Sequence, residues 1–206
     1  MITFYLVRHA CTEWNLENRI QGSRDLKLSP LGERQARRLA QRLKKEKITL
    51  IYSSDMKRTE ETAKIVRRVI RAPLRYEKGL REIHLGQWEG KTPEEVNRLY
   101  RNGHKRWLEA PSKVRIPGAE PVTQFRKRVL RAFRKLLRAA PEGKILIVTH
   151  GGVIATFLSI LLKGNEDQFL LRLRLDNAGL SILKTRDRKR MIVCSINDTS
   201  HLEGLL

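Results

Sequence analysis

The sequence predicts an α/β fold built on a mostly parallel sheet, and three apolar segments carry that prediction. Residues 3–7, 48–53 and 144–149 are rich in β-branched, aromatic and aliphatic residues, a pattern typical of strands buried on both faces. Each segment ends in polar residues and leads into a helix-forming segment, directly or after a loop. This repeated order favours parallel strands joined by right-handed crossovers.

The bulk composition is that of one globular domain spanning residues 1–206. The chain is 40% hydrophobic and 32% charged, which provides for a sizeable core. Its longest apolar stretch, 152–162, is too short to cross a bilayer, and no basic leader precedes the first strand. Cys11 and Cys194 make no disulfide framework. We therefore expect a cytoplasmic protein with no membrane segment, and association as a homodimer stays open.

The formal net charge of +21 is the extreme feature of the composition. It fits three explanations: nucleic-acid binding, an anionic small substrate, or the charge-rich surface of a thermophilic protein. The basic residues are spread over nearly every predicted helix, without an aromatic-interleaved basic strand, zinc-finger spacing or a basic tail. This distribution disfavours nucleic acid as the main ligand.

The first half of the chain predicts two strand and helix pairs. A polar segment over 12–28 leads to Ser29 and Pro30, an N-cap and a first helical residue that predict a helix to about residue 47. The strand at 48–53 runs into a second helix over 55–70. Arg58 lies in the first turn of that helix, where the helix dipole favours acids. A residue placed against local preference often marks a functional site.

The middle of the chain predicts a long irregular loop and a cap. A short strand at 73–76 leads into the glycine-punctuated segment 79–90, which carries Glu82, His84 and Glu89. Long loops in compact domains tend to be functional. A helical stretch at 93–108 and a turn-rich link at 110–121 follow. Residues from about 79 to 121 are therefore expected to form a cap-like insertion over one edge of the sheet.

The last third of the chain predicts two helices, a third buried strand, a further strand and a hairpin. The apolar face of an amphipathic helix over 122–140 includes Phe125 and Phe133, and its seven lysines and arginines are interpreted as a solvated face. The strand at 144–149 ends at His150 and leads into a helix at 153–162. A strand at 169–175 and a hairpin of 180–185 with 191–196 follow.

Three of the predicted strand ends deliver the candidate site residues Arg8 and His9, Arg58, and His150. Because the carboxyl ends of parallel strands open at the same edge of a sheet, these side chains are expected to converge. Two guanidinium groups can hold phosphate oxygens in bidentate fashion, and the helix that begins near Gly151 adds oriented N–H groups. The pattern therefore predicts a site for a phosphoryl group.

The chemistry expected at this site needs no metal or cofactor. No metal-ligand pattern such as HExxH or a paired-acid cluster occurs in the sequence, so the arginines are expected to neutralise a transferring phosphoryl group. Neutral imidazole can attack phosphorus through nitrogen, and nearby guanidinium groups favour the neutral form. One histidine would be the nucleophile and the other a donor. A carboxylic acid of the 79–90 loop would protonate the leaving group, and Glu82 is preferred over Glu89.

Several motifs together resemble one family. They are Arg8-His9-Ala10 with Thr12 and Asn15, Arg58 after Tyr52-Ser53-Ser54, Glu82 in REIHLGQWEG, His150-Gly151, Gly118-Ala119-Glu120 and Asp176-Asn177-Ala178. This set resembles the histidine phosphatase superfamily, the phosphoglycerate mutase-like branch, over nearly the whole chain. The resemblance implies a three-layer α/β/α sandwich, a phosphohistidine intermediate on His9 and Glu82 as proton donor. It also implies a phosphate pocket of Arg8, Arg58 and His150, with Asn15 as a further phosphate ligand and Gln21-Gly22 as a loop that meets the substrate.

The sequence departs from the family's usual Arg-His-Gly-Glu motif at Ala10 and Cys11. A methyl group in place of the glycine hydrogen is tolerable where φ is negative. Cys11 removes a carboxylate beside the nucleophile, and we interpret it as a buried spectator thiol rather than an oxidation site. Thr12, His84 and His201 are expected in structural roles or beside the substrate.

The predicted function is a metal-independent phosphomonoesterase acting on a small phosphorylated metabolite. The loop LREIHLGQWEG resembles alpha-ribazole phosphatases, whereas Arg-His-Ala, Asp176-Asn177-Ala178 and the neighbourhood of His201 resemble metal-independent phosphoserine phosphatases. A phosphoglycerate mutase is the weaker alternative, because the chain moves directly from the glutamate loop to Lys91-Thr92-Pro93 without extra substrate-gripping segments. The non-enzyme alternative is a phosphate-ligand or nucleic-acid binding protein that retains the fold.

Overall fold

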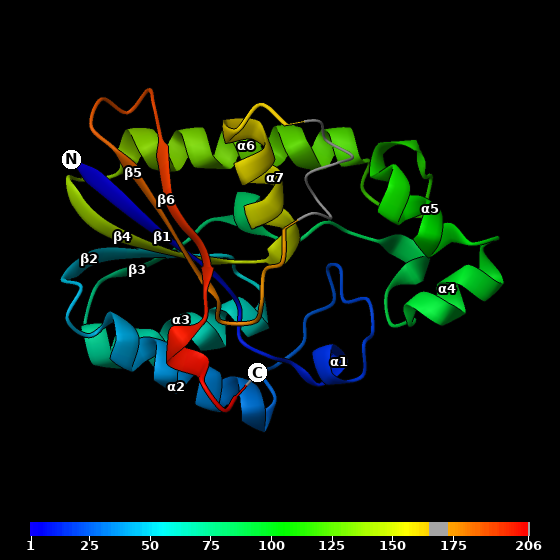
Figure 1. Cartoon of the computed structure of the whole chain (residues 1–206), viewed down its shortest axis with the longest axis horizontal. Helices are drawn as coiled ribbons and strands as arrows, with labels where there is room; N and C mark the ends of the chain where they lie inside the picture. The colour runs from blue at the N-terminus through cyan, green and yellow to red at the C-terminus, as the bar shows by residue number, and fades with distance from the viewer. Residues whose placement is uncertain (165–172, 206) are drawn as a thin grey trace.

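The computed structural model describes residues 1–164 and 173–205, which contain a six-stranded sheet (Figure 1). The strands are β1 (Ile2–Arg8), β2 (Ile48–Ser53), β3 (Leu74–Tyr76), β4 (Gly143–Thr149), β5 (Leu180–Thr185) and β6 (Ile192–Asp198). Their order is β3-β2-β4-β1-β5-β6. The first four strands in this order run parallel, and β5 pairs antiparallel with both β1 and β6. The predicted α/β fold with a mostly parallel sheet is confirmed.

Helices cover both faces of the sheet. Figure 1 shows α2 (Pro30–Leu43) and α3 (Lys57–Ile70) on one side, and α6 (Val122–Ala139) and α7 (Gly151–Leu161) on the other. The shorter helices α1 (Glu13–Leu16), α4 (Pro93–Leu99) and α5 (Gly103–Glu109) lie beyond the carboxyl end of β1. This is the three-layer α/β/α arrangement that the family resemblance implied.

Local chemistry explains where the first long helix starts and stops. The Ser29 hydroxyl accepts the N–H of Gly32 at 3.1 Å, and Pro30 occupies the first helical position, as the sequence predicted. The helix ends at Leu43 rather than near residue 47. Lys47 has a φ of 51°, a left-handed conformation that turns the chain into β2.

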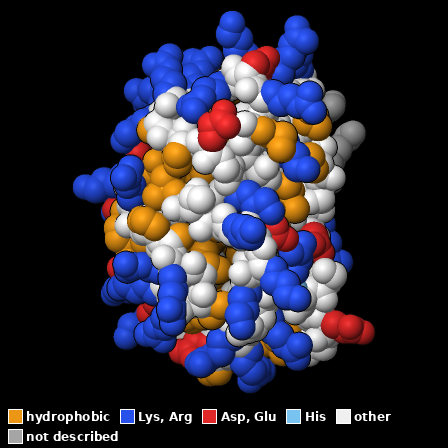
Figure 2. All heavy atoms as spheres, turned by 90° about the vertical axis from the view of Figure 1, so that its left-hand side faces the viewer, with side chains coloured by type: hydrophobic (Ala, Val, Ile, Leu, Met, Phe, Trp, Pro, Cys, Tyr) orange, Lys and Arg blue, Asp and Glu red, His pale blue; other side chains and the backbone are white. Residues whose placement is uncertain are grey.

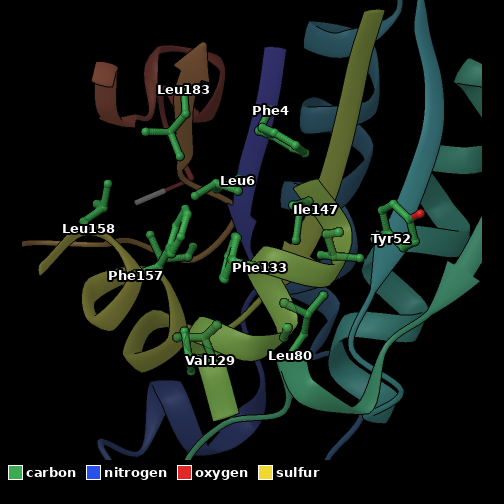
Figure 3. Close-up of a cluster of buried hydrophobic side chains, with 14 of the residues drawn as sticks. Phe4, Leu6, Tyr52, Leu80, Val129, Phe133, Ile147, Phe157, Leu158 and Leu183 are labelled. Carbon is green, nitrogen blue, oxygen red and sulfur yellow. The ribbon is translucent and has the colours of Figure 1, made fainter. Parts of the chain in front are cut away.

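An apolar cluster covers each face of the sheet, and a third, smaller cluster contains Trp88, Val96 and Ile116. On the α6 and α7 side, Phe133 and Phe157 stack with their ring centroids 3.5 Å apart, and Leu80 from the long loop packs into the same cluster (Figure 3). On the other side, Leu39 of α2 and Val66 of α3 are fully buried. Strands covered on both faces account for the absence of polar alternation in β1 and β4.

Three expectations about local structure were wrong or incomplete. The helical stretch predicted at 93–108 is two helices, because Arg101 and Asn102 adopt left-handed φ values of 49° and 57° between α4 and α5. The polar segment 12–28 contains the short helix α1, which was not predicted. Of the strand predicted at 169–175, residues 169–172 lie outside the described residues and 173–175 are irregular.

Basic side chains cover much of the surface. Arg131, Arg134 and Arg138 are exposed along α6, and the guanidinium group of Arg188 donates to the carbonyl of Leu137 at 2.9 Å. Figure 2 shows Lys and Arg side chains spread over the face on the left of Figure 1, with few acidic ones. In the described part of the chain, no helix has the length and apolarity needed to span a bilayer.

Candidate active site

Two neighbouring strands of the sheet place the two candidate histidines side by side. β1 and β4 run parallel with Arg8 opposite Thr149, so the next residue of each strand is a histidine. The His9 N–H donates to the Thr149 carbonyl at 2.8 Å, which fixes this register at the strand ends. The imidazole centroids of His9 and His150 lie 5.3 Å apart in an edge-to-face arrangement.

The ring of His9 is held in one protonation pattern. Its Nδ1 lies 2.8 Å from the carbonyl oxygen of Ala10, which can only accept, so Nδ1 carries the proton and Nε2 keeps its lone pair. The residue is 3% exposed, and burial, followed by the charges of Arg58 and Arg8, lowers the pKa of His9 well below 6.5. The imidazole is therefore neutral and its Nε2 is available as a nucleophile.

Arg58 is fully buried in the first turn of α3. Its two terminal nitrogens donate to the carbonyls of Arg24 at 2.6 Å and Gly22 at 2.8 Å. Among the described residues its Nε has no partner. Burial lowers the pKa of Arg58 to about 10, so the guanidinium remains charged at neutral pH. A buried cation with an unpartnered N–H is suited to hold an anion.

Arg8 supplies a second guanidinium at the same strand edge. One terminal nitrogen donates to the carbonyl of Leu175 at 2.6 Å. Burial lowers the pKa of Arg8, and the negative charges of Glu82 and Asp176 oppose that shift. The side chain is thus anchored at one nitrogen and presents the rest of its donor fork to the cavity that it lines.

His150 caps α7 and is fully buried. Its Nε2 lies 3.0 Å from the Ser54 hydroxyl, and its Nδ1 has no partner among the described residues. Burial, followed by the charge of Arg58, lowers the pKa of His150 well below 6.5. A neutral ring that accepts the Ser54 hydroxyl proton at Nε2 carries its own hydrogen on Nδ1.

Glu82 from the long loop reaches the beginning of α7. Its two carboxylate oxygens accept the N–H groups of Ile83 and Gly152, each at 3.0 Å. A Cβ atom at Gly152 would overlap this carboxylate, so the second glycine of His150-Gly151-Gly152 is required for the close approach. Glu82 is thereby held at the mouth of the site by main-chain donors.

These residues line one cavity of about 450 Å³. The predicted site residues on its wall are Arg8, His9, Asn15, Gln21, Gly22, Arg58, Glu82 and Gly151. His150 lies behind this wall, against His9. The sequence-predicted set therefore converges in space, as expected from the strand ends.

Three further candidates do not line the cavity. Thr12 is fully buried and caps α1, with its hydroxyl bonded to the side chain of Asn15. His84 contacts Ser23 and Glu89 through Nδ1, at 2.8 Å each. The Nε2 of His201 lies 3.1 Å from the Ala178 carbonyl. Each makes structural contacts in the shell around the site.

Glu89, the acid that was not preferred, holds two loops together. Its Oε1 accepts the N–H groups of Ser23 at 2.7 Å and Leu85 at 3.0 Å, and its side chain is 2% exposed. These donors keep the pKa of Glu89 below its usual value although burial alone would raise it. Glu89 therefore links the loop that follows Gln21-Gly22 to the 79–90 loop.

Sequence reasoning missed most of the apolar wall of the cavity. The apolar residues of the wall are Ile83, Leu85, Trp107, Phe125, Ala155, Leu173 and Leu175. The charged Arg19 also lines the cavity and was not predicted. The helix periodicity identified Phe125 only as a core residue. The others come from several elements whose convergence leaves no mark in a linear pattern.

The two departures from the usual motif have simple structural explanations. Ala10 is fully buried and lies outside the positive-φ region, so its methyl group causes no backbone strain. Cys11 is 4% exposed and its thiol lies 3.4 Å from the Thr12 carbonyl. Burial raises the pKa of Cys11, which keeps the thiol protonated and unreactive.

In residues 1–164 and 173–205, no cluster of three or more His, Cys, Asp or Glu side chains could hold a metal ion. The charged groups that face the cavity are instead guanidinium groups and one carboxylate. Two guanidinium groups, neutral imidazoles and the start of a helix are together suited to bind an oxyanion.

A sheet whose two central strands are each followed by a buried histidine, with the buried Arg58 and the partly exposed Arg8 beside them, defines an enzyme of the phosphoglycerate mutase-like class. The chain belongs to the histidine phosphatase superfamily (branch 1), whose family model matches residues 4–199. It is 34% identical over 207 residues to a Yersinia pestis (strain Pestoides F) protein named "Probable phosphoglycerate mutase GpmB", covering 98% of this chain and 96% of that protein.

Solved structures of related proteins have the same fold. YhfR of Bacillus stearothermophilus superposes with a TM-score of 0.91 at 32% identity, over 98% of this chain and 100% of YhfR. An Entamoeba histolytica phosphoserine phosphatase in complex with 3-phosphoglyceric acid gives 0.86 at 30% identity, over 98% and 100%. A candidate alpha-ribazole-5′-P phosphatase of Escherichia coli gives 0.86 over 96% of each chain, and at 21% identity this likeness concerns the fold alone.

Proposed function

We propose that this protein is a metal-independent phosphomonoesterase that hydrolyses a small phosphorylated metabolite through a phosphohistidine on His9. The observation that carries the proposal is the fixed ring of His9. Its Nδ1 donates to the Ala10 carbonyl, so the lone pair on Nε2 is free, and the guanidinium groups of the buried Arg58 and the partly exposed Arg8 act on the ring. This is the arrangement of an in-line nucleophile with the charge of its target neutralised.

The phosphate oxygens are assigned to groups that the fold leaves without protein partners. The Nε of Arg58 and the Nδ1 of His150 are buried and unpartnered among the described residues. Arg8, Asn15 and the N–H of Gly151 add further donors on the cavity wall. Together they stabilise the negative charge of the equatorial oxygens without a bound cation.

The proton transfers are assigned to Glu82. As the Nε2 of His9 bonds to phosphorus, the ester P–O bond breaks, and Glu82, which takes up a proton before this step, gives that proton to the departing oxygen. The resulting carboxylate then takes a proton from water, and the water oxygen attacks phosphorus. The P–N bond breaks, which releases inorganic phosphate and restores the neutral imidazole.

The apolar wall supports a leaving group with apolar surface. Trp107, Phe125 and Leu173 face the same cavity as the phosphate site. Arg19, also on this wall, donates to the Gly90 carbonyl at 2.8 Å and pairs with Glu17 at 2.7 Å. Of the two substrate types suggested by the sequence, alpha-ribazole phosphate carries such an apolar group, whereas phosphoserine carries a second set of charges.

The second candidate function is phosphoglycerate mutase activity, which the 34% identity to the protein named GpmB favours. A mutase returns the phosphoryl group to an acceptor hydroxyl instead of water. Incubation with 3-phosphoglycerate separates the two functions. A hydrolase releases inorganic phosphate, and a mutase yields the 2-phospho isomer.

The proposal is tested by substituting the nucleophile. His9→Ala should abolish hydrolysis of an aryl phosphate and leave no acid-labile phosphoenzyme, whereas the matched control His104→Ala, on α5 and away from the cavity wall, should retain both. Activity should also survive EDTA. Appreciable turnover by a folded His9→Ala protein would refute the nucleophile, and recovery that depends on added metal would refute metal independence.

A further inference from the structure

A short segment, residues 175–178, contacts the backbone of residues 8–12, which we call the histidine loop. The N–H of Ala178 donates to the Arg8 carbonyl at 3.0 Å and lies 3.2 Å from the His9 carbonyl. In return, Arg8 donates to the Leu175 carbonyl. Asn177 lies between these contacts but not on the cavity wall. Residues 175–178 therefore form a clasp on the histidine loop, with Leu175 on the cavity wall and Asn177 outside it.

Two amide side chains meet under this clasp, and main-chain groups define which way each points. The Oδ1 of Asn15 lies 3.0 Å from the Thr12 N–H, which can only donate, so the atom facing it must be oxygen. The Nδ2 of Asn177 lies 3.0 Å from the His9 carbonyl, which can only accept, so that atom must be nitrogen. The same Nδ2 donates to the Oδ1 of Asn15 at 3.2 Å.

The consequence is that the oxygen of Asn15 is fully used within the protein. It accepts from the Thr12 N–H, the Thr12 hydroxyl at 3.1 Å and Asn177. Asn15 lines the cavity, and among the described residues its Nδ2 has no protein hydrogen-bond partner. The amide thus presents N–H groups, and no lone pair, to an anion in the cavity.

We propose that Asn177 is a positioning residue that fixes the amide of Asn15 with its nitrogen toward the phosphate. The proposal rests on the proposed function, because it takes Asn15 as a phosphate ligand. An amide rotated by half a turn would direct an oxygen at the phosphate oxygens, and attraction would become repulsion. Asn177 opposes that rotation because its own orientation is locked by the His9 carbonyl.

A second contact holds the clasp itself in place. The side chain of Asn197 accepts the Asp176 N–H at 2.7 Å and donates to the Asp176 carboxylate at 2.8 Å. Asn197 belongs to β6, so the clasp is tied to the sheet independently of the histidine loop. The Asp176-Asn177-Ala178 motif, which carried part of the family resemblance, therefore links β6 to the histidine loop.

The test is a double-mutant cycle in which the side-chain amide of Asn177 is replaced by a carboxylate of the same shape. Asn177→Asp places an acceptor oxygen where a donor faced Asn15. It should lower kcat/KM for an aryl phosphate, and the affinity for inorganic phosphate, by about ten- to one-hundred-fold, the effect of losing one hydrogen bond to a charged group. In an Asn15→Ala background, where no amide can be misdirected, the same change should cost less than about threefold.

Two outcomes would overturn the proposal. An equal loss in both backgrounds would mean that Asn177 acts through the His9 carbonyl, and no loss in either would mean that Thr12 alone orients Asn15. If Asn177→Asp does not fold, Asn177→Ala is measured in the same cycle. Phosphate binding by calorimetry needs no turnover. It therefore tests Asn177 even if His9→Ala remains active and the proposed function fails.

Discussion

The contact between α2 and the histidine loop allows a test of whether α2 sets the position of His9. Gly32, in the first turn of α2, lies against the backbone of Cys11. A Cβ atom at Gly32 would lie 2.9 Å from the carbonyl carbon of Cys11 and would overlap its carbonyl oxygen. Since carbon atoms pack at about 3.5–4.0 Å, Gly32→Ala must move the loop by roughly 1 Å.

That displacement has two expected magnitudes. Overpacking of this kind costs about 1–3 kcal/mol of the free energy of unfolding, visible as a lower Tm. A shift of about 1 Å at a nucleophile can lower the rate about a hundred-fold, because His9 is two residues from the displaced carbonyl. We expect both effects in Gly32→Ala, measured by calorimetry and by hydrolysis of an aryl phosphate.

A matched control separates stability from positioning. Ala40→Gly lies on the same helix, away from Cys11, and should lower stability by about 1–2 kcal/mol through helix propensity and the loss of a buried methyl group. Its kcat should match that of the unmodified protein. If folded Gly32→Ala keeps kcat/KM within about twofold of the unmodified protein, the inference that α2 sets the position of His9 is refuted.

Three further predictions concern pH, the leaving group and salt. Burial lowers the pKa of His9 and of His150 well below 6.5. As the pH drops below about 6.5, these imidazoles bind protons in the unfolded chain but stay neutral in the folded protein, so the free energy of unfolding should fall. His150→Gln should show a shallower fall in Tm between about pH 7.5 and 5.5, and an unchanged slope would contradict this linkage. Glu82→Gln should slow alkyl phosphates by about 10²–10⁴-fold and activated aryl esters far less, and equal losses would argue against proton donation. Because the net charge of +21 attracts anions, kcat/KM for a dianionic substrate should fall with ionic strength while kcat holds, and insensitivity to salt would exclude electrostatic steering.

The part of the site that lies at strand ends could be predicted from the sequence. Buried strands are recognisable from their apolar runs, and parallel topology brings their ends together, so Arg8, His9 and His150 were expected to meet. Arg58 was recognisable because a positively charged side chain at a helix N-terminus opposes the helix dipole. The buried strands and the long amphipathic helices could be predicted because continuous apolar runs in the strands and apolar residues at helical spacing in the helices both reflect burial.

The remaining features depend on contacts that a linear pattern does not encode. The break between α4 and α5 depends on two left-handed residues inside a segment whose apolar spacing fits one helix. Trp107 and Leu173 reach the same cavity from distant parts of the chain. The polarity match between Asn15 and Asn177 spans 162 positions and is defined by main-chain groups brought together only by folding.

The position of β1 in the sheet has a consequence for biosynthesis. Among the described strands β1 is synthesised first, yet its partners β4 and β5 lie more than a hundred residues later in the sequence. Its apolar run must therefore wait, unpaired, while more than a hundred further residues are synthesised, and such non-local pairing is intrinsically slow and prone to aggregation. A nascent chain that stops before β4 would carry His9 without His150 or the complete cavity wall, so the site cannot assemble until β4 and the start of α7 have been synthesised.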